Sequence, residues 1–128
     1  DGVLIKDNHL AGLGPDFAAA VESASSGCRE QMNPRFIEIE VDDLEQFDRI
    51  LDLPSGTVDI VLLDNMDLDS IQEAVGRRDE RRRGIQLEVS GGVTLESVRA
   101  FAETGVDRIA VGAITHSATQ IDFGLDIQ

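Results

Sequence analysis

Short runs of β-branched and apolar residues alternate along the chain with segments in which apolar residues recur every three or four positions. The runs predict five strands, over residues 3–6, 36–41, 58–64, 85–90 and 108–111. The segments between them predict four amphipathic helices with the apolar stripes Phe17, Ala20, Val21, Ala24; Leu44, Phe47, Ile50, Leu51; Leu68, Ile71, Ala74, Val75; and Leu95, Val98, Phe101, Ala102. Repeated strand-then-helix units predict parallel strands with right-handed crossovers, in either a barrel or a doubly wound sheet.

Polar residues and glycines at the ends of the predicted helices support this division. Asp42 followed by Glu45 has the spacing of a capping box, and Thr94 is a suitable N-cap for the fourth helix. Gly105 is placed to follow the end of that helix. No internal repeat or low-complexity tract is evident, so we expect one α/β domain.

Alternate side chains along each predicted strand differ in character. In every strand, one set of alternate residues, here called one parity, is aliphatic: Val3, Ile5, Ile37, Ile39, Val41, Val61, Leu63, Leu87, Val89, Ile109 and Val111. In a barrel these side chains face the helices, and the other parity points inward. The inward parity ends, strand by strand, in Lys6, Glu40, Asp64, Ser90 and Gly112. Because active sites of (β/α) barrels lie at the carboxyl ends of the strands, we expect these five residues to share one site.

A phosphate site is predicted where the last two strands end. Ser90, Gly91 and Gly92 lie between a strand and the helix expected near Thr94. Glycines there let backbone N–H groups approach a phosphate, and a helix N-terminus favours its charge. Gly112 follows the next strand and would complete the site, as in barrels that bind phosphate with their last two loops.

The charged strand ends are compatible with more than one chemistry. Glu40 and Asp64 are candidate ligands for Mg²⁺ or for ribose hydroxyls, because both prefer carboxylate oxygens. Alternatively, one or both pair with Lys6 inside the barrel. Lys6 is also compatible with a Schiff base in an aldolase, since such lysines occupy barrel strand ends. Glu38 and Glu88 lie one layer deeper, where charge is costly without a partner, and we expect their partners outside this chain.

The remaining reactive side chains carry weaker predictions. His9 is expected to line the rim or cap the next helix, and His116 to approach a phosphate or stabilise its loop. The two histidines do not have the spacing of a metal site. Cys28 lies in a predicted loop with no catalytic context, and a single cysteine excludes an internal disulfide and fits a cytoplasmic location.

Composition and charge exclude several classes of partner. The 128 residues are 41% hydrophobic and 28% charged, which is typical of a soluble globular domain, and no apolar run approaches the roughly 20 residues that span a bilayer. A net charge of −14 argues against a nucleic-acid surface, so neither nucleic acid nor membrane is an expected partner. Residues 77–83 are mostly arginine with interleaved acids, which predicts a solvated connector between a helix and a strand.

Five motifs are more specific than the alternation of polar and apolar residues. They are Leu4-Ile5-Lys6-Asp7-Asn8-His9, Ile37-Glu38-Ile39-Glu40-Val41-Asp42, Val61-Leu62-Leu63-Asp64-Asn65, Leu87-Glu88-Val89-Ser90-Gly91-Gly92, and a last motif over residues 104–117. In this order, over essentially the whole chain, they resemble quinolinate phosphoribosyltransferases. Val89 departs from the family, which often has a small residue there, but its side chain is expected to face the helices. The resemblance implies that residues 1–128 are the C-terminal part of a (β/α) barrel of the phosphoribosyltransferase type, incomplete in this chain.

The resemblance also implies an activity. In that family quinolinate and phosphoribosyl pyrophosphate give nicotinate mononucleotide, pyrophosphate and CO₂, with Mg²⁺, in NAD biosynthesis. By matching motif positions, Lys6 would contact a substrate anion, and Glu40 and Asp64 would hold the ribose and the metal. The 5′-phosphate and neighbouring substrate groups would be bound by Ser90, Gly91, Gly92, Gly112 and His116. Such catalysis consists mainly of positioning and electrostatic stabilisation.

Parts of the family's architecture have no counterpart in this sequence. These are an N-terminal sandwich domain, the first barrel strands, and the arginines and histidine that grip quinolinate. Five strands cannot close a barrel and leave sheet edges exposed. Residues 121–127 resemble the family's last strand. We therefore expect a fragment of a homo-oligomeric enzyme, dimer or higher, with little or no transferase activity alone. The alternatives are a non-catalytic piece that pairs its edges with another copy, and a phosphate-binding barrel lyase that uses Lys6.

Overall fold

The computed structural model describes residues 1–6, 9 and 14–116, without the side chains of Pro15 and His116. Five strands are β1 (Val3–Ile5), β2 (Ile37–Val41), β3 (Ile60–Asp64), β4 (Gln86–Ser90) and β5 (Arg108–Ile109). The helices are η1 (Gly14–Asp16, a 3₁₀ turn), α2 (Phe17–Met32), α3 (Leu44–Leu51), α4 (Leu68–Arg81), α5 (Val98–Glu103) and α6 (Ala113–His116). Within these residues no helix has both the length and the apolar character needed to cross a bilayer.

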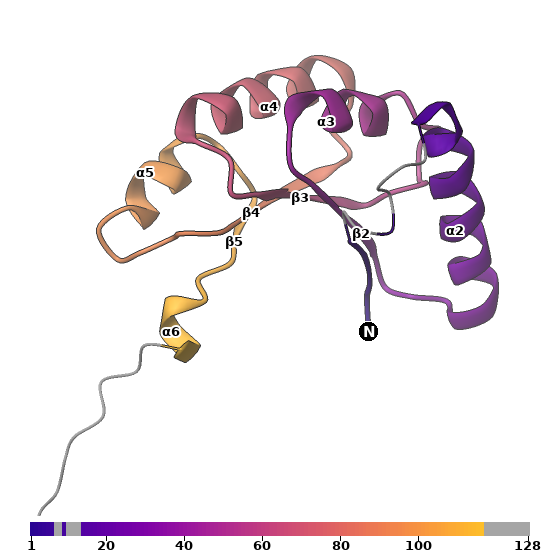
Figure 1. The fold of residues 1–128 in the computed structure, drawn as a ribbon, viewed down its shortest axis with the longest axis horizontal. Helices are drawn as coiled ribbons and strands as arrows, with labels where there is room; N and C mark the ends of the chain where they lie inside the picture. The colour runs from indigo at the N-terminus through magenta and orange to yellow at the C-terminus, as the bar shows by residue number, and fades with distance from the viewer. Residues whose placement is uncertain (7–8, 10–13, 117–128) are drawn as a thin grey trace, which may run out of the picture.

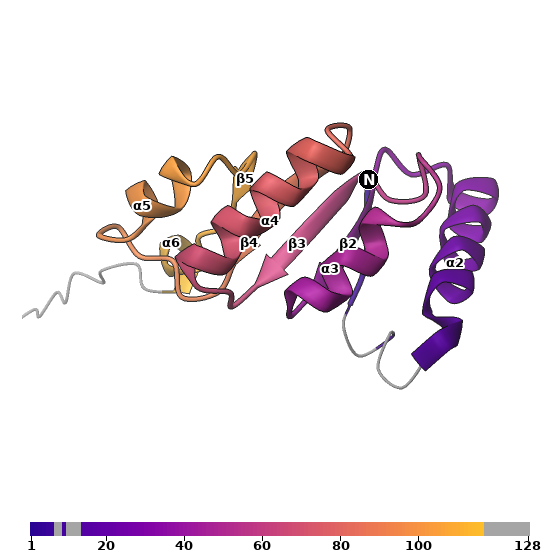
Figure 2. The same cartoon turned by 90° about the horizontal axis from the view of Figure 1, so that it is seen from above.

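The strands form one parallel sheet in the order β1-β2-β3-β4-β5. Helices α2 to α5 form an outer layer over one face of this sheet (Figures 1 and 2). In the described part of the chain no helix runs along the other face, and the short α6 lies on that side below β5 (Figure 1). A doubly wound sheet would reverse its strand order and carry helices on both faces. Sequential order with one helical layer is the wall of a (β/α) barrel, which confirms the predicted fold class. Within the described residues β1 and β5 each pair on one side only, so the barrel is not closed.

The core lies between the sheet and the helices. Ile39, Val61 and Leu87 stand in register on three neighbouring strands, and each is fully buried. Phe47 of α3 and Ile71 of α4 belong to the same core cluster and are equally buried. Burial of each such side chain contributes about 1.5–3 kcal/mol. The predicted orientation of the aliphatic parity toward the helices is therefore confirmed.

The start of α3 differs by one residue from the sequence prediction. Asp43, not Asp42, is the N-cap, and its side chain accepts a hydrogen bond from the Gln46 N–H at 2.8 Å. Gln46 Oε1 accepts in return from the Asp42 N–H at 3.1 Å. The segment thus has a reciprocal capping arrangement, but it is made by Asp43 and Gln46 instead of Asp42 and Glu45.

The fourth helix also begins later than predicted. Helix α5 starts at Val98, and the four residues before it form a turn in which Thr94 N–H donates to Ser97 Oγ at 2.9 Å. Ser97 N–H donates back to Thr94 Oγ1 at 3.3 Å, so Thr94 closes a turn and does not cap the helix. Leu95 lies in this turn and is 83% exposed, outside the core. Gly105, with φ of +92°, follows the helix end as predicted.

Two further predictions of local structure were wrong. Cys28 lies within helix α2 and packs against the core, because the helix continues through a polar stretch to Met32. The arginine-rich segment is not a solvated connector, since residues 77–81 form the end of helix α4. There Arg77 and Arg81 both pair with Asp48 of α3, at 2.5 and 2.7 Å. Cations are favourable in the last turn of a helix, and here they also join two helices.

Candidate functional site

The polar residues predicted to share a site lie at one end of the uncovered face. Lys6, Glu40, Asp64 and Ser90 occupy the carboxyl ends of β1 to β4, or the position directly after, and Gly112 follows β5. The register places Asp64 directly beside Ser90. The parallel order brings these strand ends to one rim of the sheet, as the sequence predicted.

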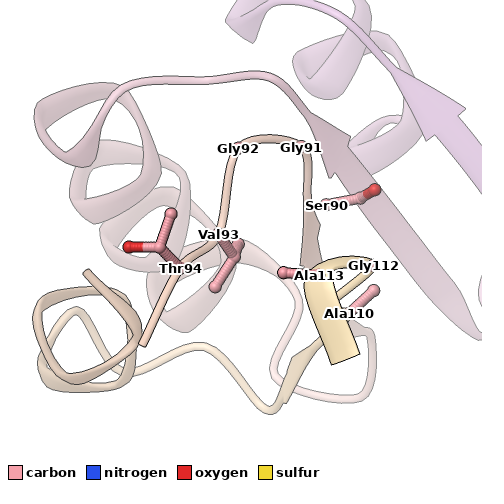
Figure 3. Close-up of a pocket in the computed structure, with 8 residues that line it drawn as sticks. All are labelled: Ser90, Gly91, Gly92, Val93, Thr94, Ala110, Gly112 and Ala113. Carbon is pink, nitrogen blue, oxygen red and sulfur yellow. The ribbon is translucent and has the colours of Figure 1, made fainter. Parts of the chain in front are cut away.

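The ends of β4 and β5 enclose a hollow of about 480 Å³. It is lined by Ser90, Gly91, Gly92, Val93, Thr94, Ala110, Gly112 and Ala113. Figure 3 shows the turn through Gly91 and Gly92 above the hollow, with Gly112 and Ala113 at the start of α6 beside the end of β4. Ser90, Gly91, Gly92 and Gly112 thus line one cavity, as predicted for a phosphate site, and three of these four residues are glycines.

The loop after β3 holds the loop after β4 in place. Asn65 N–H donates to the Ser90 carbonyl oxygen at 3.0 Å, and Asn65 Nδ2 donates to Asp64 Oδ2 at 2.7 Å. Gly91 has φ of +91°, and a Cβ there would lie 2.1 Å from Asn65 Oδ1. Only glycine satisfies both the backbone conformation and the close approach. Sequence reasoning gave Asn65 no role, although it directly follows Asp64 in a recognised motif.

Lys6 and Glu40 form an ion pair across β1 and β2. Lys6 Nζ lies 3.5 Å from Glu40 Oε2, and the Glu40 side chain is only 9% exposed while that of Lys6 is 51% exposed. The backbone N–H of Lys6 donates to His9 Nδ1 at 3.2 Å, so His9 lies at the rim. The remaining members of this motif, Asp7 and Asn8, lie outside the described residues. The pairing anticipated between Lys6 and a strand-end carboxylate is present and leaves the ammonium group half open to solvent.

The two deeper glutamates have different surroundings. Glu88 Oε2 lies 2.6 Å from Arg108 Nε, so the expectation that its partner lies outside this chain was wrong. These residues are directly opposite each other in the register of β4 and β5, and Arg108 also lies over the Phe36 ring at 5.6 Å. Glu38 Oε1 is buried and has no hydrogen-bond partner among the described residues. Its burial, followed by the charge of Glu88, raises the pKa of Glu38 above the usual value.

The carboxylates at the rim suit a hard cation bound together with a substrate. Within residues 1–6, 9 and 14–116, no three His, Cys, Asp or Glu side chains gather as a metal cage. Mg²⁺ is usually held by only one or two carboxylates together with substrate phosphates and water. Glu40 and Asp64, near the carboxyl ends of the neighbouring strands β2 and β3, provide such a donor set, so their chemistry fits the predicted ion.

Two C-terminal predictions are only partly described. The backbone of His116 ends helix α6, four residues after Gly112. Residues 121–127, predicted to form a last strand, lie outside the described residues.

Two part-buried arginine–aspartate contacts escaped the sequence analysis. Asp59 and Asp107 each precede a strand, and each accepts a hydrogen bond from an arginine of an earlier helix, Arg29 and Arg78. A signal for them exists, because both aspartates follow a valine directly before a strand. The shared pattern is only a valine and an aspartate before a strand, with an arginine earlier in the chain. So short a pattern cannot be recognised in the sequence before the contacts are known.

Comparisons with known proteins give a consistent set of matches. Residues 1–126 match the family described as the C-terminal domain of quinolinate phosphoribosyl transferase. The chain is 43% identical over 127 residues to nicotinate-nucleotide pyrophosphorylase (carboxylating) of Mycobacterium leprae, covering 99% of this chain and 42% of that protein. It is 36% identical to a probable enzyme of the same name from Methanocaldococcus jannaschii, covering 99% and 44%. The crystal structure of nicotinate-nucleotide pyrophosphorylase from Ehrlichia chaffeensis superposes with a TM-score of 0.73 at 41% identity, covering all of this chain and 43% of that one. The chain thus spans about two-fifths of the length of its curated relatives.

Proposed function

This chain belongs to the quinolinate phosphoribosyltransferase C-terminal domain family, and we propose that its rim binds phosphoribosyl pyrophosphate for transfer of the phosphoribosyl group to quinolinate. The products would be nicotinate mononucleotide, pyrophosphate and CO₂. The observation that carries the proposal is the hollow formed by Ser90, Gly91, Gly92 and Gly112 at the ends of β4 and β5. A wall of glycine backbone suits a phosphate, because N–H groups can approach its oxygens without interference from side chains.

The charged residues Lys6, Glu40 and Asp64 would contact the substrate on the side of the ribose away from its 5′-phosphate. As pyrophosphate leaves, positive charge develops at the ribose carbon, and fixed carboxylates at Glu40 and Asp64 would stabilise it. Lys6 would bind an anionic group, either the pyrophosphate or a quinolinate carboxylate. Mg²⁺, when bound through Glu40 and Asp64, would neutralise part of the charge on the pyrophosphate. Binding of the same substrate by His116 stays a prediction from the sequence. The chain's contribution to catalysis is positioning and electrostatic stabilisation.

The alternative use of Lys6 as a Schiff-base nucleophile is less well supported. Such a lysine attacks as a neutral amine and is usually activated by a desolvated pocket or a second cation. Lys6 instead lies half exposed and 3.5 Å from a buried carboxylate. These surroundings suit an ammonium group that binds anions.

The proposal is tested by calorimetric titration of phosphoribosyl pyrophosphate and Mg²⁺ into the 128-residue chain. We expect Ser90→Ala and Asp64→Ala each to weaken binding by roughly tenfold to a hundredfold, because each removes a contact to a charged group. Ser55→Ala, at an exposed position near the opposite end of β3, is the matched control and should bind like the parent. No binding by the parent, or equal losses in Ser55→Ala and Ser90→Ala, would refute the proposed site.

Turnover is a separate question from binding. The rim described here contains no cluster of arginines suited to the two carboxylates of quinolinate. We therefore propose that the isolated chain has little or no transferase activity, and steady-state assay with both substrates tests this. Homo-oligomerisation and a cytoplasmic location stay predictions from the sequence.

A further inference from the structure

Arg78 is buried in helix α4 and contacts Asp107, a residue with a side chain 36% exposed that lies directly before β5. Arg78, in helix α4, is only 8% exposed, and its Nη1 donates to Asp107 Oδ2 at 2.5 Å. The same carboxylate oxygen accepts from the Leu87 N–H at 2.8 Å, and the Asp107 N–H donates to the Leu87 carbonyl oxygen at 3.0 Å. Asp107 therefore makes two hydrogen bonds to Leu87 of β4, and Arg78 of α4 donates a third to the Asp107 carboxylate.

A contact of the same design lies two strands earlier. Arg29 of α2 donates to Asp59 Oδ2 at 2.8 Å, and that oxygen also accepts from the Ile37 N–H at 2.7 Å. The Asp59 N–H donates to the Ile37 carbonyl oxygen at 2.9 Å. The first contact joins β4 to the start of β5, and this one joins β2 to the start of β3.

The two contacts differ in how much else holds the strand that follows. Strand β3 has neighbours on both sides, with four residue pairs to β2 and five to β4. Strand β5 has two residue pairs to β4 and no second neighbour among the described residues. A slip of one residue would exchange the two faces of β5 and move Gly112 away from Gly91. So short a ladder resists such a slip weakly, which makes the Asp107 contact decisive for register.

We propose that Arg78 and Asp107 are positioning residues for the phosphate hollow, because they lock the register of β5 on β4 and so place Gly112 opposite Gly91 and Gly92. Neither side chain lines the hollow. They act through the backbone, because Ser90 and Ala110, which line the hollow, lie three residues beyond Leu87 and Asp107. That the ligand is a phosphoribosyl compound rests on the proposed function, whereas the positioning itself is a property of the strands.

The test compares Asp107→Asn with Asp59→Asn, which makes the same change at the matched contact. Asparagine keeps an oxygen for the strand N–H but loses the charge that holds the arginine. In the 128-residue chain, NMR should show faster amide hydrogen exchange, by about tenfold or more, at Ala110, whose N–H donates to the Val89 carbonyl oxygen at 2.8 Å. The amide signals of Gly91 and Gly112 should shift in Asp107→Asn and remain at parent positions in Asp59→Asn. Arg78→Gln is a second variant with the same expected pattern, and urea unfolding checks that each variant is folded.

The binding of phosphoribosyl pyrophosphate with Mg²⁺ provides the functional readout. Asp107→Asn should weaken it by about tenfold, and Asp59→Asn should not, even if both lose similar stability. Equal changes in the two variants, or unshifted glycine signals in both Asp107→Asn and Arg78→Gln, would overturn the positioning role. If the parent chain binds no ligand, the proposed function fails, and the exchange and shift data still decide the positioning role.

Discussion

The two faces of the five-stranded sheet differ in what covers them and in what their side chains do. On the helix-covered face, Ile39, Val61 and Leu87 are fully buried in one continuous apolar cluster. On the other face, the sheet carries carboxylates, of which Glu40 pairs with Lys6 and Glu88 pairs with Arg108. Because side chains alternate along a strand, one set of strands supplies both stability and chemistry. Whether a strand residue contributes to the core or to the polar face therefore depends on the face to which its side chain points, more than on its position along the chain.

The difference between the faces also separates stability from ligand binding. Substitutions on the covered face should lower the free energy of unfolding and leave the rim geometry unchanged once the chain is folded. Substitutions at the rim should alter ligand affinity at a smaller cost in stability. Three comparisons of neighbouring or related positions test this division.

The largest effect is expected for adjacent leucines of β3. Leu63 is fully buried under the helices, and Leu63→Ala should lower the free energy of unfolding by about 2–5 kcal/mol. Leu62 is also little exposed but faces the uncovered side and lies outside the core cluster. Leu62→Ala should therefore cost only about 1 kcal/mol, because fewer packed groups surround the space it leaves. Urea unfolding measures both, and equal losses would mean that the two faces contribute alike.

A smaller effect is expected at the glycines that line the hollow. Gly91→Ala combines positive φ with a collision against Asn65 and should cost about 2–3 kcal/mol. Gly92 also has positive φ, but an added Cβ meets nothing within 4 Å, so Gly92→Ala should cost about 1 kcal/mol. Gly91→Ala should also weaken phosphoribosyl pyrophosphate binding more, since it displaces the contact between Asn65 and Ser90. Calorimetry with urea unfolding separates the two effects, and an inverted order would contradict the described loop geometry.

The smallest effect is expected for Glu38→Gln and depends on pH. Burial raises the pKa of Glu38, with Glu88 and Glu40 acting in the same direction and Arg108 opposing them. The folded chain then retains a proton that the unfolded chain has lost, so Glu38 lowers stability as pH rises from the usual glutamate pKa through the raised value. Glu38→Gln removes this loss, and its urea midpoint should exceed that of the parent at pH 7.

The excess midpoint of Glu38→Gln should shrink as pH falls below the usual glutamate pKa, where the parent's Glu38 becomes protonated in both folded and unfolded chains. Exposed Glu80→Gln is the control and should follow the parent across the same pH range. A variant less stable than the parent at pH 7 would show that the Glu38 carboxylate is stabilised by its surroundings.

The sequence alone determined the features that depend on periodicity and on parallel strand order. The alternation of aliphatic and polar residues predicted which face of each strand would be buried, as at Ile39 and Glu40. Parallel strands carry all their carboxyl ends to one rim, so Asp64 and Ser90 could be assigned to one site without coordinates. The family motifs then indicated which chemistry such a rim supports, and the ligand itself stays a prediction.

Only the tertiary structure decided the features that depend on register and on exact chain direction. The Glu88–Arg108 pair, the packing of Asn65 against Gly91 and the contacts of Asp59 and Asp107 join residues that are close only after strands pair. The caps shifted because backbone direction at Asp43 and Ser97, not residue type alone, decides which N–H a side chain reaches. Local propensity acts over a few residues, whereas these contacts span about 20 residues or more along the chain and require the packed sheet.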